Sequence, residues 1–164
     1  MISSEGKKAL EHQHRTLVLV WVGFLATLAV YLALPWLGSY SEAIPLPLGG
    51  PSFDISRTSL WAIVVVIVGI LWWWNQRFLA KEALLKNYAP KRGTPIFSYA
   101  VKKIVAFALA EAVAIYGLIL ALSGRHLWDQ LVLSVIAALF LLYLYPSRTF
   151  FDELLKEMEA RTGS

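Results

Sequence analysis

Four long apolar stretches, separated by polar or turn-forming residues, constrain this chain more than any other feature. The first, from Leu17 to Leu34, is an uncharged run of 18 residues. At a helical rise of 1.5 Å per residue, such a run matches the ~30 Å hydrocarbon core of a bilayer. Backbone groups in lipid must bond to one another, so helix is expected even where β-branched residues dominate. We therefore predict an all-α membrane protein with spans at about 17–35, 59–76, 103–123 and 127–145.

The composition supports one membrane domain, residues 1–164, and excludes several kinds of chemistry. The chain is 58% hydrophobic and 16% charged, which is too apolar for an ordinary soluble domain. It has no cysteine, so disulfides, iron–sulfur clusters and thiolate catalysis are excluded. Its three histidines are scattered, and no phosphate-binding loop or nucleophile motif is present. We expect no metal, no cofactor and no enzymatic activity.

The first apolar stretch is interpreted as a retained membrane helix rather than a cleaved signal peptide.

Two amphipathic segments are predicted outside the apolar stretches. Residues 77–102 form a basic connection whose helical part stops before Pro90. Residues 149–161 begin with a capping-box pattern, then place apolar residues on one face and i,i+4 charge pairs on the other. The link between the third and fourth stretches is so short that these two spans must form an antiparallel hairpin.

Basic residues set the predicted orientation. Of the fifteen Lys and Arg residues, thirteen lie in the N-terminal segment, the 77–102 connection or the tail, and only Arg57 and Arg125 lie at the opposite ends of the spans. Because positive charge is retained in the cytoplasm, both termini are predicted to be cytoplasmic, in a multi-pass protein of the bacterial inner membrane. Charges at membrane exits are explained by topology and anionic headgroups, so nucleic acid is not a predicted partner.

Three consecutive tryptophans end the second stretch. Trp72, Trp73 and Trp74 stand where an interfacial aromatic belt belongs, and we interpret them as anchors at the headgroup level. A platform for a pigment or quinone is the alternative.

The third stretch contains the main candidate site, Glu111. A carboxyl in the bilayer is costly and usually faces inward, paired or lining a pathway. Beside it, small residues recur at intervals of three and four and favour close approach of another helix: Ala106, Ala110, Ala114, Gly117 and Ala121. Glu111 is either a hydrogen-bonded structural carboxyl or a proton or sodium site. The sequence leaves both readings open.

Residues 108–118, ALAEAVAIYGL, resemble the carboxylate-bearing helix of the ATP synthase c subunit, the rotor proteolipid. The resemblance implies that Glu111 is an ion-binding carboxylate and that Tyr116 belongs to the same helix segment. The c subunit's first helix is a glycine ladder, whereas residues 59–74 contain only Gly69. The layout as a whole is similar to small bacterial four-helix membrane proteins of unassigned function.

Two functions follow as expectations. The first is a non-enzymatic integral subunit or assembly factor of a larger, energy-transducing membrane complex. Its partners would be the lipid bilayer and other membrane subunits, including a second copy of the chain. The alternative is a proteolipid-like protein that translocates protons or sodium ions through Glu111.

Overall fold

The computed structural model describes residues 4–38, 51–80, 84, 95–124 and 127–162. Within these residues every regular element is an α-helix: α1 (Ser4–Gly38), α2 (Pro51–Phe78), α4 (Pro95–Gly124), α5 (Leu127–Tyr143) and α6 (Arg148–Thr162). The predicted all-α class is therefore confirmed for the described part of the chain. α2 ends at Phe78, and most of the helical part predicted for the 77–102 connection lies outside the described residues, as does His126.

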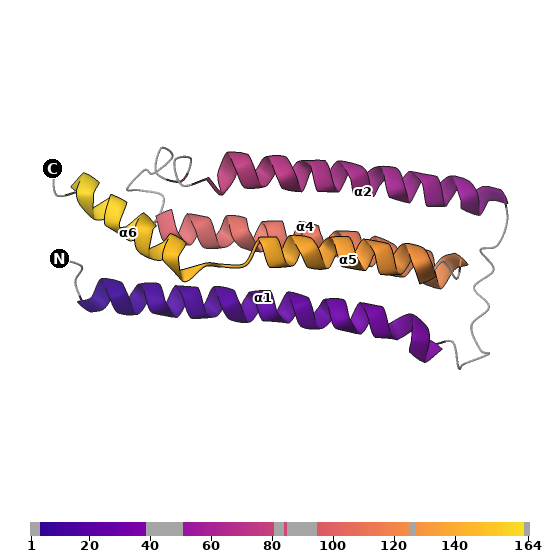
Figure 1. The fold of residues 1–164 in the computed structure, drawn as a ribbon, viewed down its shortest axis with the longest axis horizontal. Coiled ribbons are helices and arrows are strands. Elements are labelled where there is room, and N and C mark those ends of the chain that lie inside the picture. Colours follow the sequence, from indigo (N-terminus) through magenta and orange to yellow (C-terminus); the bar gives the residue numbers. More distant parts are fainter. Residues whose placement is uncertain (1–3, 39–50, 81–83, 85–94, 125–126, 163–164) are drawn as a thin grey trace.

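The four long helices lie lengthwise beside one another (Figure 1). α4 and α5 form the predicted antiparallel hairpin and make the most extensive contact in the fold, with α1 packed against both helices and α2 against α4. The start of α1, the end of α2, the start of α4 and the whole of α6 lie at one end of the bundle (Figure 1). We refer to this end as the α6 end, and to the other as the loop end.

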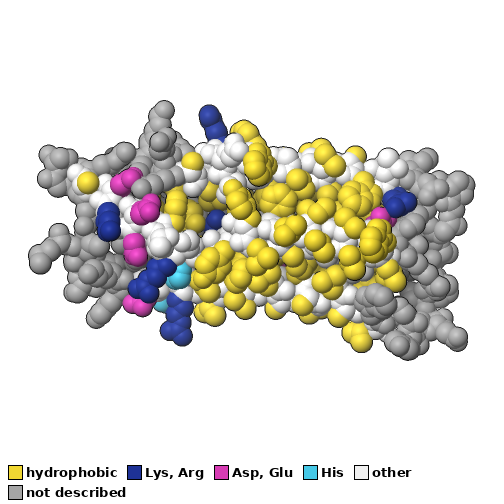
Figure 2. All heavy atoms as spheres, in the orientation of Figure 1, with side chains coloured by type: hydrophobic (Ala, Val, Ile, Leu, Met, Phe, Trp, Pro, Cys, Tyr) yellow, Lys and Arg dark blue, Asp and Glu magenta, His cyan; other side chains and the backbone are white. Residues whose placement is uncertain are grey.

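In the described part of the chain, three helices are long and apolar enough to cross a membrane: Glu11–Pro35, Arg57–Phe78 and Phe97–Leu122. A fourth crossing is counted if α5 and the first part of α6, which are bent by 42° at their junction, are taken as one span. Hydrophobic side chains cover the middle of the bundle, and charged side chains gather at its ends (Figure 2). The third apolar segment begins at Phe97, earlier than the predicted residue 103, because Lys102 and Lys103 lie within the helix. α6 matches the predicted tail helix closely.

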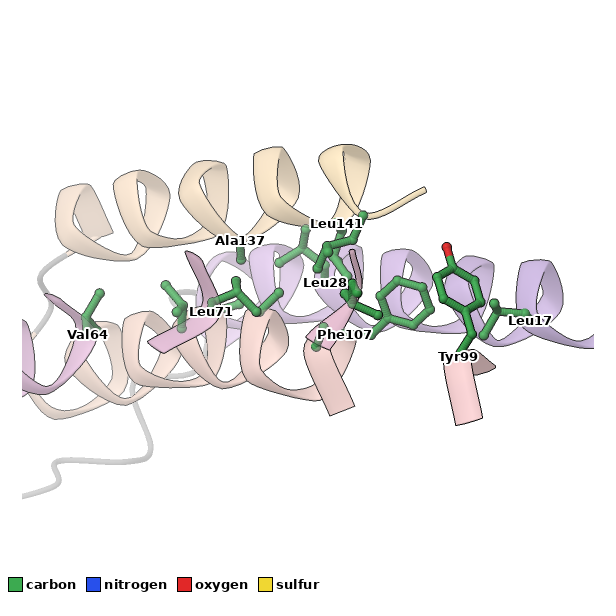
Figure 3. Close-up of a cluster of buried hydrophobic side chains, with 14 of the residues drawn as sticks. Leu17, Leu28, Val64, Leu71, Tyr99, Phe107, Ala137 and Leu141 are labelled. Carbon is green, nitrogen blue, oxygen red and sulfur yellow. The ribbon is translucent and has the colours of Figure 1, made fainter. Parts of the chain in front are cut away.

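α4 is the central helix of the bundle. In the 18-residue apolar part of α4, 44% of the residues are buried, compared with 11% in the corresponding parts of α1 and α2. Leu133, Ala137 and Leu141 of α5 recur every fourth residue and are fully buried, which gives α5 one continuous inner face. Figure 3 shows part of this core, from Val64 and Leu71 at one end to Tyr99 and Leu17 at the other.

Pro146 determines how α5 ends and how α1 is held against it. Proline has no N–H, so the Leu142 carbonyl cannot accept its usual bond from residue 146. The Tyr145 N–H instead donates to Leu142 at 3.1 Å, which leaves the Leu141 carbonyl open. The Trp21 indole of α1 donates to that carbonyl at 2.7 Å. A single proline thus creates an acceptor that joins two distant helices.

Candidate functional site

Glu111 lies at the contact between α4 and α1, and its side chain is half-buried. The Tyr31 hydroxyl of α1 donates to Glu111 Oε1 over 3.3 Å, which is long for an O–H···O bond. Apolar neighbours alone would leave this carboxyl without a donor, so the Tyr31 hydroxyl explains how an acid is tolerated in this apolar segment.

Tyr31 is also bonded through its backbone. Four residues later α1 contains Pro35, which supplies no N–H to the Tyr31 carbonyl. Gln130 of α5, which is almost fully buried, fills this position, with its Nε2 donating to the Tyr31 carbonyl at 2.5 Å. Glu111, Tyr31 and Gln130 therefore form one polar centre, which we call the α1–α4–α5 polar centre.

An ion pair lies at the loop end of the same helices. Arg57 near the start of α2 donates through Nε and Nη2 to the two carboxylate oxygens of Asp129, at 2.6 and 2.9 Å. The Asp129 side chain is only 5% exposed, whereas that of Arg57 is 43% exposed. Asp129 is in the first turn of α5, where the helix dipole favours a negative charge. The pair fixes the start of α2 against the α4–α5 hairpin.

The small-residue stripe is used inside this chain. All five members are buried. Gly117 faces α5 so closely that a Cβ added there would lie 3.1 Å from the Leu133 Cβ and 3.2 Å from the Gln130 Cα. The close helix approach that the stripe predicts is therefore the α4–α5 contact. The structure does not leave these residues accessible to a partner helix.

The three tryptophans have different environments. Trp72 and Trp73 are exposed on the surface of α2, and their anchoring role stays a prediction. Trp74 is half-buried, its ring is 4.6 Å from that of Phe78, and its Nε1 donates to the Lys102 carbonyl at 3.4 Å. Trp74 thus helps to pack α2 against α4.

Searches of protein-family models, curated proteins and solved structures found no match to this chain. The resemblance of residues 108–118 to the rotor proteolipid accordingly stays a prediction. No group of three or more His, Asp or Glu side chains that could hold a metal ion occurs among the described residues. His14, one of the scattered histidines, instead donates through Nε2 to the Pro146 carbonyl at 3.0 Å.

The polar groups are distributed unevenly around Glu111. In the direction of the loop end, Gln130 is bonded to the Tyr31 carbonyl, and Asp129, the residue before Gln130 in α5, pairs with Arg57. In the direction of the α6 end, the buried face of α4 continues with Ala110, Phe107 and Ala106, all fully buried and apolar. Chemically, the centre can hold a protonated or hydrogen-bonded carboxyl with polar neighbours on one side.

Sequence reasoning found Glu111 and the stripe but missed Tyr31, Gln130 and the Arg57–Asp129 pair. Pro35 was an available signal, since a proline inside a membrane helix leaves the carbonyl four residues earlier without its donor. Arg57 and Asp129 were also assigned to neighbouring span ends at the same predicted membrane face, where opposite charges favour pairing. The sequence does not show how each helix is rotated about its axis, so it could not tell which of these side chains meet.

Proposed function

We propose that this chain is a non-enzymatic integral subunit or assembly factor of a larger, energy-transducing membrane complex in the bacterial inner membrane. Four crossings with both termini in the cytoplasm fit the apolar helices and the distribution of basic residues. The departures from the rotor proteolipid, above all the missing glycine ladder, favour an accessory role over that of a rotor subunit.

One observation supports this proposal most. At the centre of the bundle Glu111 is bonded to Tyr31, and Gln130 to the Tyr31 backbone, while the buried Ser134 hydroxyl has no hydrogen-bond partner among the described residues. Polar neighbours extend from Glu111 toward one end, while Phe107 and Ala106 close the other direction along α4. A transporter needs polar access from both faces, whereas a subunit needs no continuous polar pathway through the bundle.

The topology can be tested with single cysteines, because the chain has none of its own. Ser52→Cys, close to the start of α2, should react with a membrane-impermeant maleimide added outside the cell. Ser98→Cys, near the start of α4, should react only after the membrane is opened. The reverse pattern would overturn the orientation.

The subunit proposal is tested by crosslinking from two sides of the bundle. Leu19 of α1 and Val65 of α2 are 64% and 66% exposed, and each can carry a single cysteine with a short crosslinker. A seated partner should crosslink in high yield from one position and not the other, and should co-migrate with the chain in native electrophoresis. Equal weak crosslinking from both positions, with only a monomer on the gel, would contradict the proposal.

Ion translocation is the second candidate, and the environment of Glu111 favours it. Its carboxyl is half-buried, and the 3.3 Å bond from Tyr31 is weak enough to be exchanged for an ion or proton. In liposomes, a proton or sodium flux abolished by Glu111→Gln and retained by Glu11→Gln, which changes an exposed carboxyl of α1, would establish this function. Equal flux in the wild type and Glu111→Gln would exclude it.

A further inference from the structure

The α6 end of the bundle contains a cluster of aromatic rings contributed by three helices. Tyr99 of α4 stacks on Phe150 of α6 with a centroid distance of 4.7 Å, and meets the edge of Phe151 at 5.2 Å. His14 of α1 contacts the other side of Phe151 at 5.5 Å. Tyr99 and Phe151 are almost fully buried. We call these four residues the α1–α4–α6 aromatic cluster.

A lysine is buried next to this cluster. Lys103 follows Tyr99 by one helical turn, is only 6% exposed, and places its Nζ 5.6 Å from the centroid of the Tyr99 ring. The ammonium group contacts this ring, no ion pair or hydrogen bond to another described residue is present, and Nζ is not among the fully enclosed side-chain atoms of the described residues, so it keeps a small exposed surface. An aromatic face offsets part of the cost of removing a cation from water, but an unpaired buried charge remains unfavourable. The site is therefore short of one anion.

Lys102, the preceding residue, provides an internal comparison. It lies at the same level of α4 but is only half-buried, with its Nζ 5.7 Å from the centroid of Phe78 on α2. The two lysines are adjacent in α4 and have the same charge, but they face different helices and differ in burial. A nonspecific attraction to an anionic lipid surface would involve both lysines about equally. A specific binding site between the helices would depend on Lys103 alone.

We propose that Lys103 binds the phosphate group of an anionic phospholipid where α1, α4 and α6 meet. The apolar surface stops at this end of the bundle and charged side chains begin, which is the level of lipid headgroups (Figure 2). Basic sites between membrane helices pair with headgroup phosphates on the cytoplasmic side. Most of the basic residues in the described part of the chain lie at this end. The phosphate supplies the missing anion, and the aromatic cluster shields the pair from water, which strengthens it.

The experiment measures thermal unfolding in detergent for the wild type, Lys103→Met and the control Lys102→Met. Each is tested without lipid, with phosphatidylglycerol, with phosphatidylcholine and with inorganic phosphate. Phosphatidylglycerol should raise the Tm of the wild type and Lys102→Met, and phosphatidylcholine less so. Lys103→Met should lose the response, with bound phosphatidylglycerol in native mass spectra reduced about fivefold, the value expected for one lysine near an anionic surface.

Without lipid, Lys103→Met should be at least as stable as the wild type, because it removes an unpaired buried charge. If it does not fold, Lys103→Arg, which keeps the charge, should retain the phosphatidylglycerol response. An equal response in Lys102→Met, Lys103→Met and the wild type would overturn the proposal, as would its loss in both Met variants. A Tm increase of the same size with inorganic phosphate alone would show that the site binds a free anion, and would overturn the proposal that the ligand is a lipid. An equal response to phosphatidylcholine would overturn the requirement for an anionic headgroup.

Discussion

The contact between α4 and α5 and the contact of α1 with these two helices are built in different ways. Between α4 and α5, small side chains allow the backbones to approach closely. A Cβ added at Gly117 would lie only 3.1–3.3 Å from atoms of α5. α1 is instead held by directed hydrogen bonds: Tyr31 donates to Glu111 of α4, Gln130 of α5 donates to the Tyr31 carbonyl, and Trp21 donates to the Leu141 carbonyl of α5. Lipid gives no hydrophobic drive between helices, so these are the two forces available.

The difference teaches that the two contacts should fail for different reasons. Close packing fails when bulk is added, because the whole helix must move away. A hydrogen-bonded contact fails when a donor is lost, because a backbone carbonyl is then left without a partner in an apolar surrounding.

The largest effect is expected for Gly117→Leu. The added side chain meets the Gln130 backbone, which cannot rotate aside, so α5 must separate from α4. We expect a loss of about 3 kcal/mol in the free energy of unfolding, at the upper end of typical overpacking costs. Denaturation in mixed micelles, followed by tryptophan fluorescence, measures it. Gly69→Leu is the matched control, since a Cβ at Gly69 meets nothing within 4 Å; equal losses in the two variants would contradict the packing argument.

Much of the fold could be predicted because the length and apolarity of a stretch are properties of the sequence itself. The hairpin followed from the short link, and the tail helix from its capping and charge pairs. α4 begins at Pro95, before the predicted start of the third span at 103, so Lys102 and Lys103 lie inside the helix. A lysine can lie inside a helix at the headgroup level when an aromatic ring, such as that of Tyr99, covers its stem.

The polar centre could be predicted only in part. Glu111 stands out because it is a charge in an apolar stretch, and that property needs no structure. Its partner does not stand out, because Tyr31 lies 80 residues away and reaches Glu111 only through the rotation and offset of α1. Pro35 indicates an open carbonyl at Tyr31, yet only the packing of α5 shows that Gln130 supplies the donor.

The second prediction concerns this proline-opened carbonyl and uses a double-mutant cycle. Gln130→Met keeps the side-chain length but removes the donor to Tyr31, and should cost about 1–2 kcal/mol of unfolding free energy. In a Pro35→Ala background, the new N–H at position 35 can bond to the Tyr31 carbonyl, so the same Gln130 change should cost less than about 0.5 kcal/mol. Equal costs in both backgrounds, measured by the same denaturation assay, would show that Gln130 acts only by packing.

The last prediction asks how much the bond between Tyr31 and Glu111 contributes. Glu111→Ala removes the acceptor and should cost roughly 0.6–1.7 kcal/mol, the range for hydrogen bonds between membrane helices. Glu111→Gln keeps an oxygen acceptor for the Tyr31 hydroxyl and should change stability by less than about 0.5 kcal/mol.

Ala114→Leu, on the packed face one turn away and fully buried, should be worse than either Glu111 variant in both stability and co-purification. A different order would identify the state of the carboxyl. If Glu111→Gln were the most damaging, Glu111 must be ionised and paired with a cation supplied from outside the described residues. If both Glu111 variants were as stable as the wild type but lost ion flux, the bond to Tyr31 would be dispensable for the fold, and ion translocation would replace the subunit proposal.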